Sequence, residues 1–150
     1  MEKTFAMIKP NAVQRNLIGE IVARIERKGF VIHALKFVMV TKKQAEAHYN
    51  VHRDKPFFND LVESITSGPV VVMVVGGNNI VEILRLLAGA TKPTESLPGT
   101  IRGDFSNDIG MNVIHTSDSI ENAKYEIGVY FSEDEIIDYD KTLNKEVFSQ

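Results

Sequence analysis

Val70-Val71-Val72-Met73-Val74-Val75 is a run of six apolar side chains, five of them β-branched valines. Such side chains pack well on a pleated sheet, and a run that is apolar on both faces is typical of a strand at the centre of a covered sheet. The preceding Ser67-Gly68-Pro69 has the composition of a turn and predicts where this strand starts. We therefore expect a sheet that has residues 70–75 at its centre.

Three other segments have the composition of strands. Residues 4–8 predict a short strand that ends at Lys9-Pro10, because proline disfavours helix at the residue before it. Residues 30–40 are rich in apolar residues on both faces, which predicts a well-covered strand. Residues 112–115 predict a fourth strand, which delivers His115 to its end.

Helices are predicted between and after the strands. Apolar residues recur at helical spacing in four segments: Ile18/Ile21/Val22/Ile25, ended by Gly29; Phe58/Leu61/Val62/Ile65, after Pro56; Ile80/Ile83/Leu84/Leu87, ended by Gly89; and Ile120/Ala123/Ile127/Tyr130. Thr41 with Gln44 forms a capping-box signature that opens a further helix, and Asp118 with Glu121 predicts the N-cap of the last one. This element order predicts an α+β fold, with one antiparallel sheet and helices over a face.

Residues 89–110 show no sustained periodicity, and they contain prolines and glycines that interrupt regular structure. A loop of this length inside a compact domain is more often functional than accidental. We therefore expect residues 89–110 to contribute to a functional site.

The bulk composition predicts one globular domain over residues 1–150, with 43% hydrophobic and 25% charged residues. A net charge of −3 gives no basic field for nucleic acid, so nucleic acid is not expected as the main partner. The absence of cysteine excludes disulfides and thiolate metal sites. Neither a secretory signal nor an apolar run of membrane-spanning length is evident, so we expect no membrane association and a cytoplasmic location.

Two residues could carry nucleophilic chemistry. His115 lies in Asn112-Val113-Ile114-His115-Thr116-Ser117-Asp118, and a neutral imidazole can accept a phosphoryl group covalently. Glu126 borders the apolar stripe of the last predicted helix, where neither Asn122 nor Tyr130 could pair with it as a cation. A partly buried carboxylate needs a hydrogen-bond donor, and the second ring nitrogen of His115 would serve. Alternatively, His115 finishes a strand over the core and Glu126 is solvated.

Phosphoryl transfer also needs converging positive charge. Arg85 lies on the polar side of its predicted helix, Arg102 lies in the long loop, and Lys9 ends the first strand. Guanidinium forks suit phosphate oxygens, although each of these cations could also be an ordinary surface charge. Phe57 precedes a buried stripe, so it is either partly exposed, as a stacking surface for a base, or part of the core.

Several familiar motifs are missing or incomplete. The chain has neither the G-x-x-x-x-G-K-[ST] of a P-loop nor a G-x-G-x-x-G dinucleotide fingerprint. His48 and His52 have a spacing that could hold a metal on a helix, but the glutamate of H-E-x-x-H is missing and no third ligand is evident. We therefore predict no protein metal site.

The segment from Asn112 to Asp118 resembles the Asn-x-x-His-x-Ser-Asp signature of the nucleoside diphosphate kinases. The resemblance covers nearly the whole chain and includes Ala6-Met7-Ile8-Lys9-Pro10, His48-Tyr49, Lys55-Pro56-Phe57-Phe58, Ser67-Gly68-Pro69-Val70, Gly89-Ala90-Thr91 and Pro98-Gly99-Thr100-Ile101-Arg102-Gly103-Asp104-Phe105. It implies a ferredoxin-like βαββαβ core with extra helices, a long loop and a C-terminal tail. It also implies ping-pong transfer of a γ-phosphoryl group from a nucleoside triphosphate to a nucleoside diphosphate, through a phosphohistidine at His115.

The resemblance assigns a role to each candidate site residue. Next to the nucleophile, Glu126 orients His115, Ser117 hydrogen-bonds near it in addition to any capping role, and Tyr49 borders the imidazole. The nucleotide contacts that it implies are Lys9 and Asn112 at the sugar hydroxyls, with Lys9 also near the transferred phosphoryl, Arg85, Thr91 and Arg102 at the phosphates, and Phe57 and Ile109 on either side of the base.

The resemblance also implies a cofactor and an assembly. Magnesium would be carried mainly by the nucleotide phosphates, because no cluster of carboxylates offers a dedicated site. A homo-oligomer is expected, a hexamer rather than a tetramer, with residues 93–98 at a three-fold contact. The long tail after Phe131 would be consistent with a hexamer.

At three positions the chain departs from many family members, which have Arg at Met111, Gly or Ala at Thr116, and Glu at Gly76. We expect Gly76-Gly77 to loosen the entry to the following helix and to weaken a contact that helps place Arg85, and Thr116 to restrict the loop after His115. All three departures are expected to alter kinetics at most. Two other functions remain open on the sequence. One is a non-catalytic ferredoxin-like module that binds single-stranded nucleic acid or a protein, and the other is a phosphocarrier that passes its group to a protein.

Overall fold

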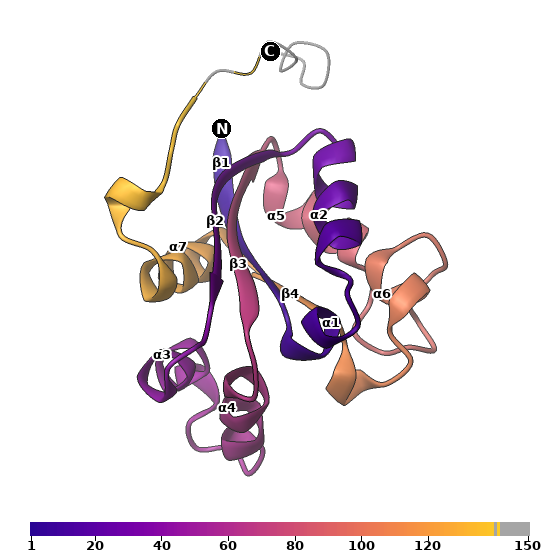
Figure 1. The fold of residues 1–150 in the computed structure, drawn as a ribbon, viewed down its shortest axis with the longest axis vertical. Helices are drawn as coiled ribbons and strands as arrows, with labels where there is room; N and C mark the ends of the chain where they lie inside the picture. Colours follow the sequence, from indigo (N-terminus) through magenta and orange to yellow (C-terminus); the bar gives the residue numbers. More distant parts are fainter. Residues whose placement is uncertain (140, 142–150) are drawn as a thin grey trace.

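The computed structural model describes residues 1–139 and 141, and over this part of the chain four strands form one antiparallel sheet (Figure 1). The strands are β1 (Glu2–Ile8), β2 (Val31–Val38), β3 (Val70–Gly77) and β4 (Ile114–Thr116), in the order β2-β3-β1-β4. β1 pairs with β3 and β4, and β3 also pairs with β2. Every residue of β3 is buried, which confirms the prediction of a covered central strand.

Helices connect the strands in the order expected of a ferredoxin-like βαββαβ core. α1 (Pro10–Gln14) and α2 (Ile18–Arg27) join β1 to β2, and α3 (Lys42–His48) and α4 (Phe58–Thr66) are additional helices between β2 and β3. α5 (Ile80–Ala88) and α6 (Ile101–Phe105) lead to β4, and α7 (Ile120–Tyr130) follows it. Short 3-10 helices, η1 (Asn50–His52), η2 (Ile109–Met111) and η3 (Glu133–Glu135), complete the described chain. The α+β fold class is therefore confirmed.

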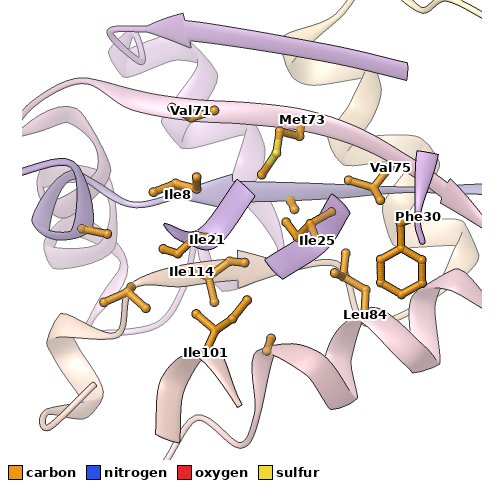
Figure 2. Packing of buried hydrophobic residues seen from close by; sticks show 14 of the residues in the cluster. Ile8, Ile21, Ile25, Phe30, Val71, Met73, Val75, Leu84, Ile101 and Ile114 are labelled. Carbon is orange, nitrogen blue, oxygen red and sulfur yellow. The ribbon is translucent and has the colours of Figure 1, made fainter. Parts of the chain in front are cut away.

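Helices cover both faces of the sheet, whereas we expected them over one face from the sequence. On the first face, buried side chains of β1 and β3 such as Ile8 and Met73 pack against Ile21 and Ile25 of α2 and Leu84 of α5 (Figure 2). On the second face, the cluster is built by β1 and β3 with α3, α4 and α7. Strands that are apolar on both sides need cover on both sides, because each buried aliphatic side chain contributes about 1.5–3 kcal/mol only when water is excluded.

The prediction that residues 30–40 form a well-covered strand was wrong in one respect. β2 lies at the edge of the sheet, where Leu35 and Phe37, with Met39 directly after the strand, have exposed fractions of 47%, 60% and 57%. Their spacing of two puts them on one face of the sheet, and the helices of the described chain do not extend over that face at this edge. An exposed apolar row on an edge strand is a candidate contact surface.

Two short helices were not predicted. α1 starts with Pro10 directly after β1, and α6 starts at Ile101 inside the segment that was expected to be an irregular loop. The Thr100 side chain accepts a hydrogen bond from the Gly103 backbone N–H and caps α6. Both helices span only five residues, which is too short for a periodic apolar pattern to emerge.

Three details at the end of the chain were also wrong. The fourth strand starts at Ile114 and includes Thr116, so Asn112 lies just before it. The N-cap of α7 is Ser119, whose side chain accepts from the Asn122 backbone N–H, whereas Asp118 accepts from the Asn122 side chain. Ile120 is 38% exposed and does not face inward. Much of the predicted C-terminal tail, residue 140 and residues 142–150, lies outside the described residues.

The fold places the end of β4 under the second helical layer. His115 pairs with Met7 across the β1–β4 ladder, so both side chains point to the face that α3, α4 and α7 cover. Among the described residues, no helix has both the length and the apolar composition that crossing a membrane requires.

Candidate active site

A cavity of about 630 Å³ lies where β4, α3, α5, α6 and α7 meet. The predicted site residues that line it are Lys9, Tyr49, Phe57, Arg85, Thr91, Arg102, His115 and Glu126. The structure therefore gathers residues that are up to 117 positions apart around one hollow. Asn112, Ser117 and Ile109 are not among the lining residues.

His115 and Glu126 are in direct contact. His115 Nε2 is hydrogen-bonded to Glu126 Oε1, and the Ser117 hydroxyl donates to Glu126 Oε2 over 2.7 Å. An ionised carboxylate only accepts hydrogen bonds, so the contact assigns the imidazole proton to Nε2. Nδ1 of His115 consequently carries the lone pair. The His115 side chain is 24% exposed and lines the cavity, whereas Glu126 is buried.

Burial and charge set the protonation states of this pair. Burial lowers the pKa of His115, and the nearby His48 and Lys9 act in the same direction, against the raising effect of Glu126. Burial alone would raise the pKa of Glu126, but hydrogen bonding to His115 and the contacts with His48 and Ser117 outweigh it and lower that pKa. A neutral His115 imidazole, with its proton on Nε2 and a lone pair on Nδ1, is the state required of a nitrogen nucleophile. The ionised Glu126 stabilises this tautomer.

Three cations face the same cavity. Arg102 is buried and donates to the carbonyl oxygens of Gly89 over 2.6 Å and Ile114 over 2.8 Å. Burial and the neighbouring Arg85 lower the pKa of Arg102 to about 10. Burial and the neighbouring Arg102 lower the pKa of Lys9 to about 8. Because these positive charges destabilise one another, a bound polyanion would relieve the repulsion.

Tyr49 follows α3 directly and is nearly buried. Burial and the charge of Glu126 raise the pKa of Tyr49 to about 12. Its phenol therefore keeps its proton at neutral pH and can donate a hydrogen bond into the cavity.

The remaining predicted residues occupy different environments. Phe57 is 44% exposed at the start of α4, as one of the two alternatives expected, and its ring lies 5.4 Å from that of His52. Ile109 on η2 is 58% exposed and lies outside the cavity lining. Asn112 is buried, and its Oδ1 has no hydrogen-bond partner among the described residues.

His48 is a site residue that was not predicted from the sequence. It was considered there only as a metal partner of His52, but its buried ring lies 4.7 Å from the His115 ring. His48 Nε2 approaches Glu126 Oε1 at 3.2 Å, and His48 Nδ1 lies 2.7 Å from the Tyr130 hydroxyl. The available signal was its place on the inner side of a capped helix, between the buried Ala45 and Tyr49.

A metal could be held only by a limited set of groups among the described residues. Ligand atoms of His48, His115 and Glu126 lie within 4.8 Å of one another. Two imidazoles and one carboxylate do not match the all-oxygen preference of magnesium. Of the cavity's two carboxylates, Asp118 and Glu126, the second is already engaged by His115 and Ser117. These groups are therefore a poor match for a magnesium ion held by the protein alone.

Comparison with known proteins gives the same family throughout. The family model for nucleoside diphosphate kinase matches residues 2–136. A nucleoside diphosphate kinase from Archaeoglobus fulgidus is 55% identical over 141 residues, which cover 94% of this chain and 93% of the relative. These matches support the kinase and not the non-catalytic binding module.

Solved structures agree with this assignment. A halophilic nucleoside diphosphate kinase from Halobacterium salinarum, in complex with CDP, has a TM-score of 0.94 and 45% identity, with 99% of both chains covered. A nucleoside diphosphate kinase family protein from Babesia bovis has a TM-score of 0.96 and 41% identity, with 99% of this chain and 100% of that chain covered. By sequence and by fold, the chain belongs to the nucleoside diphosphate kinase family and is a phosphotransferase.

Proposed function

We propose that this chain transfers the γ-phosphoryl group in two steps, through a covalent phosphohistidine at His115. The observation that supports this most is the contact of His115 Nε2 with Glu126, which leaves Nδ1 with a free lone pair in a cavity lined by three cations. An unprotonated ring nitrogen and nearby positive charge are the two requirements for in-line attack on a phosphorus atom.

In the first step, the Nδ1 lone pair forms a bond to the γ-phosphorus. The bond from that phosphorus to the β–γ bridging oxygen breaks, and the nucleoside diphosphate leaves with the electron pair. In the second step, a terminal phosphate oxygen of another nucleoside diphosphate attacks the phosphohistidine, and the N–P bond breaks to restore the lone pair on Nδ1. The bonds made and broken are alike, so the reaction runs near equilibrium in both directions.

Arg85, Arg102 and Thr91 are proposed to hold the phosphates, and Lys9 the transferred group and the sugar. Positive side chains in a cavity stabilise the charge that develops on the phosphoryl oxygens. Tyr49 borders the imidazole as a protonated phenol, and Asn112 is the second proposed contact to the sugar hydroxyls. Magnesium bound to the nucleotide phosphates would supply additional charge neutralisation.

Phe57 is proposed to provide a stacking surface for the base, and Ile109 to contact the opposite side of the base. Stacking on a flat face discriminates poorly between bases. We therefore expect the substrates to be nucleoside di- and triphosphates of several bases. Because these substrates are cytoplasmic metabolites, a cytoplasmic location is part of the proposal.

A homo-oligomer is also proposed, a hexamer rather than a tetramer. The exposed row of Leu35 and Phe37 on the edge strand β2 and Met39 directly after it supports a contact between copies, because apolar edges are usually covered. Light scattering on the full chain measures the mass and distinguishes six copies from four. A monomeric mass would contradict the proposal.

The phosphohistidine is tested with ATP labelled on its γ-phosphate. The parent protein is expected to retain acid-labile, base-stable label and to release it as labelled GTP when GDP is added. His115→Ala should bind nucleotide but retain no label, whereas His33→Gln, which alters a histidine outside the cavity, should behave as the parent does. Label retained by His115→Ala would refute the proposed nucleophile, and discharge to proteins but not to GDP would indicate a phosphocarrier.

A further inference from the structure

Tyr130 and His48 form a buried pair behind the candidate active site. The Tyr130 hydroxyl, at the end of α7, lies 2.7 Å from His48 Nδ1 on α3, and both residues are buried. Phe5 of β1 stacks on the Tyr130 ring with centroids 5.0 Å apart and an interplanar angle of 8°. The Phe5 and His48 rings form a T-shaped pair, with centroids 5.9 Å apart and an interplanar angle of 76°. Three elements therefore fix the positions of both rings.

The proton positions in this pair follow from the carboxylate beside it. His48 Nε2 lies 3.2 Å from Glu126 Oε1, the same oxygen that His115 Nε2 contacts. A lone pair facing an ionised carboxylate would be repelled, so His48 carries its proton on Nε2. Nδ1 of His48 then accepts a hydrogen bond, and the Tyr130 hydroxyl is the donor. Among the described residues, that hydroxyl has no other hydrogen-bond partner.

The contact between His48 and Glu126 is close but is not aligned as a full hydrogen bond, so it acts mainly through charge. Its effect is geometric as well. A glutamate side chain has several rotatable bonds, and Ser117 restrains only Oε2. A partial positive charge on His48 Nε2 favours the rotamer in which Oε1 remains between the two imidazoles.

We propose that His48, oriented by Tyr130, is a positioning residue for the Glu126 carboxylate and so for the tautomer of His115. This inference rests on the proposed phosphohistidine mechanism and deepens it. The Tyr130 hydroxyl donates to His48 Nδ1, and the partial positive charge at His48 Nε2 faces the Glu126 oxygen that holds His115. Neither Tyr130 nor His48 is required to touch the transferred phosphoryl group.

The charge distribution supports the same role. Burial is the main cause of the lowered pKa of His115, and the proximity of His48 lowers this pKa further, which keeps Nδ1 of His115 unprotonated as the solution becomes more acidic. The groups packed around His115 are Glu126 of α7, His48 of α3 and Lys9 after β1. Only Glu126 among these three raises the pKa of His115. Removing His48 should therefore favour protonation of the nucleophile.

The first experiment compares His48→Leu, His48→Gln and Tyr130→Phe in single-turnover phosphorylation by ATP, with ADP affinity measured in parallel. His48→Leu should slow phosphorylation by about 10–100-fold, the range for groups that orient a reacting ligand, with unchanged ADP affinity. Tyr130→Phe keeps the ring stacked on Phe5 and should cause a smaller loss. His48→Gln places an amide N–H near the position of Nε2 and should recover much of the rate lost in His48→Leu.

The matched control is Tyr139→Phe, which removes a phenol hydroxyl that donates to the Ile32 carbonyl over 3.2 Å, outside the cavity. It should phosphorylate as the parent does. The second readout is the pH dependence of phosphorylation. The acidic limb, where His115 becomes protonated, should move to higher pH in His48→Leu and stay unchanged in Tyr139→Phe.

Three results would overturn the inference. The first is an unchanged phosphorylation rate in both His48→Leu and Tyr130→Phe. The second is a weaker ADP affinity with no change in the phosphorylation rate. The third is a His48→Gln protein that phosphorylates no faster than His48→Leu. If His48→Leu does not fold, Tyr130→Phe and His48→Gln are compared with the parent by the same criteria. Failure of the parent protein to form phosphohistidine would refute the proposed function, whereas equal rates in parent and variants would refute only the positioning role.

Discussion

The His33 imidazole occupies the space that a side chain at Gly76 would need. A Cβ atom on Gly76 would overlap Nε2 and Cδ2 of His33, which lies on the neighbouring strand at the β-bulge between Ile32 and Ala34. His33 is buried, and its Nδ1 lies 2.8 Å from the carbonyl oxygen of Ile137, to which it donates. Gly76 belongs to β3 and not to the start of the following helix. The expectation that it loosens this helix was therefore wrong, and its small size is explained by packing.

Gly76→Ala should destabilise the fold by about 1–3 kcal/mol, the usual effect of inserting a methyl group into a packed interior. The same substitution in a His33→Ala background should have a much smaller effect, because the ring that it meets is gone. Chemical denaturation of the four proteins in this cycle measures the coupling. Gly19→Ala is the control, since a Cβ there meets nothing within 4 Å. Equal destabilisation by Gly76→Ala in both backgrounds would contradict the packing explanation.

The sequence predicted the sheet well where apolar runs are long, as in β3, and the helices well where the apolar spacing is regular. It failed at α1 and α6, because a five-residue helix is set by its first residues and tertiary contacts and not by a periodic pattern. It also failed to place β2 at the edge. Leu35, Phe37 and Met39 have the composition of a covered strand, and composition alone does not distinguish a strand at the centre of a sheet from one at its edge.

The active site also contains contacts that the sequence predicted and contacts that it did not. The contact between His115 and Glu126 could be expected from a carboxylate that lacks a cation within reach on its own helix. The burial of His48 could be expected but its contact with Glu126 could not, because a histidine on the inner side of a helix has the same pattern whether it fills the core or contacts a catalytic group. Ser119 replaced Asp118 as the helix cap for a local reason, since both residue types are good caps and neighbouring positions compete.

Replacement of Glu126 should impair phosphorylation of His115 without abolishing it. Glu126→Ala removes the acceptor for Nε2–H and should slow phosphorylation by about 10–100-fold. The neutral Glu126→Gln should fall between the parent and Glu126→Ala. Because Glu126 raises the pKa of His115, either substitution should move the acidic limb of the pH–rate profile to lower pH. Glu135→Gln, which alters a carboxylate paired with Lys36, is the control. A Glu126→Ala protein with an unchanged rate would show that the carboxylate has no orienting role.

Nucleotide affinity should depend on the charge of Lys9. Its pKa is lowered to about 8 by burial and Arg102, so Lys9 is charged below this pH in the free protein and neutral above it. A bound phosphate favours the charged form, and therefore ADP affinity should fall as the pH rises through about 8. The terminal phosphate of ADP completes its ionisation at about pH 6, so it does not contribute to the fall in affinity at about pH 8. Calorimetric titration of ADP on both sides of pH 8 measures the effect. Lys9→Met should bind more weakly below pH 8 and lack the step, and a step that persists in this variant would assign it to another group.

The aromatic surface of Phe57 should contribute to affinity without selecting the base. Base–aromatic stacking is worth about 1–3 kcal/mol, so Phe57→Ala should weaken ADP binding by about 5–150-fold. Every base presents a flat face, and thus the loss should be similar for ADP, GDP and dTDP. Tyr139→Ala is a matched control, because Tyr139 and Phe57 are both 44% exposed but only Phe57 lines the cavity. Parallel titrations of the three diphosphates separate the outcomes. A loss restricted to one base would mean that the site reads the edge of the base and not its face, and no loss at all would remove Phe57 from the nucleotide site.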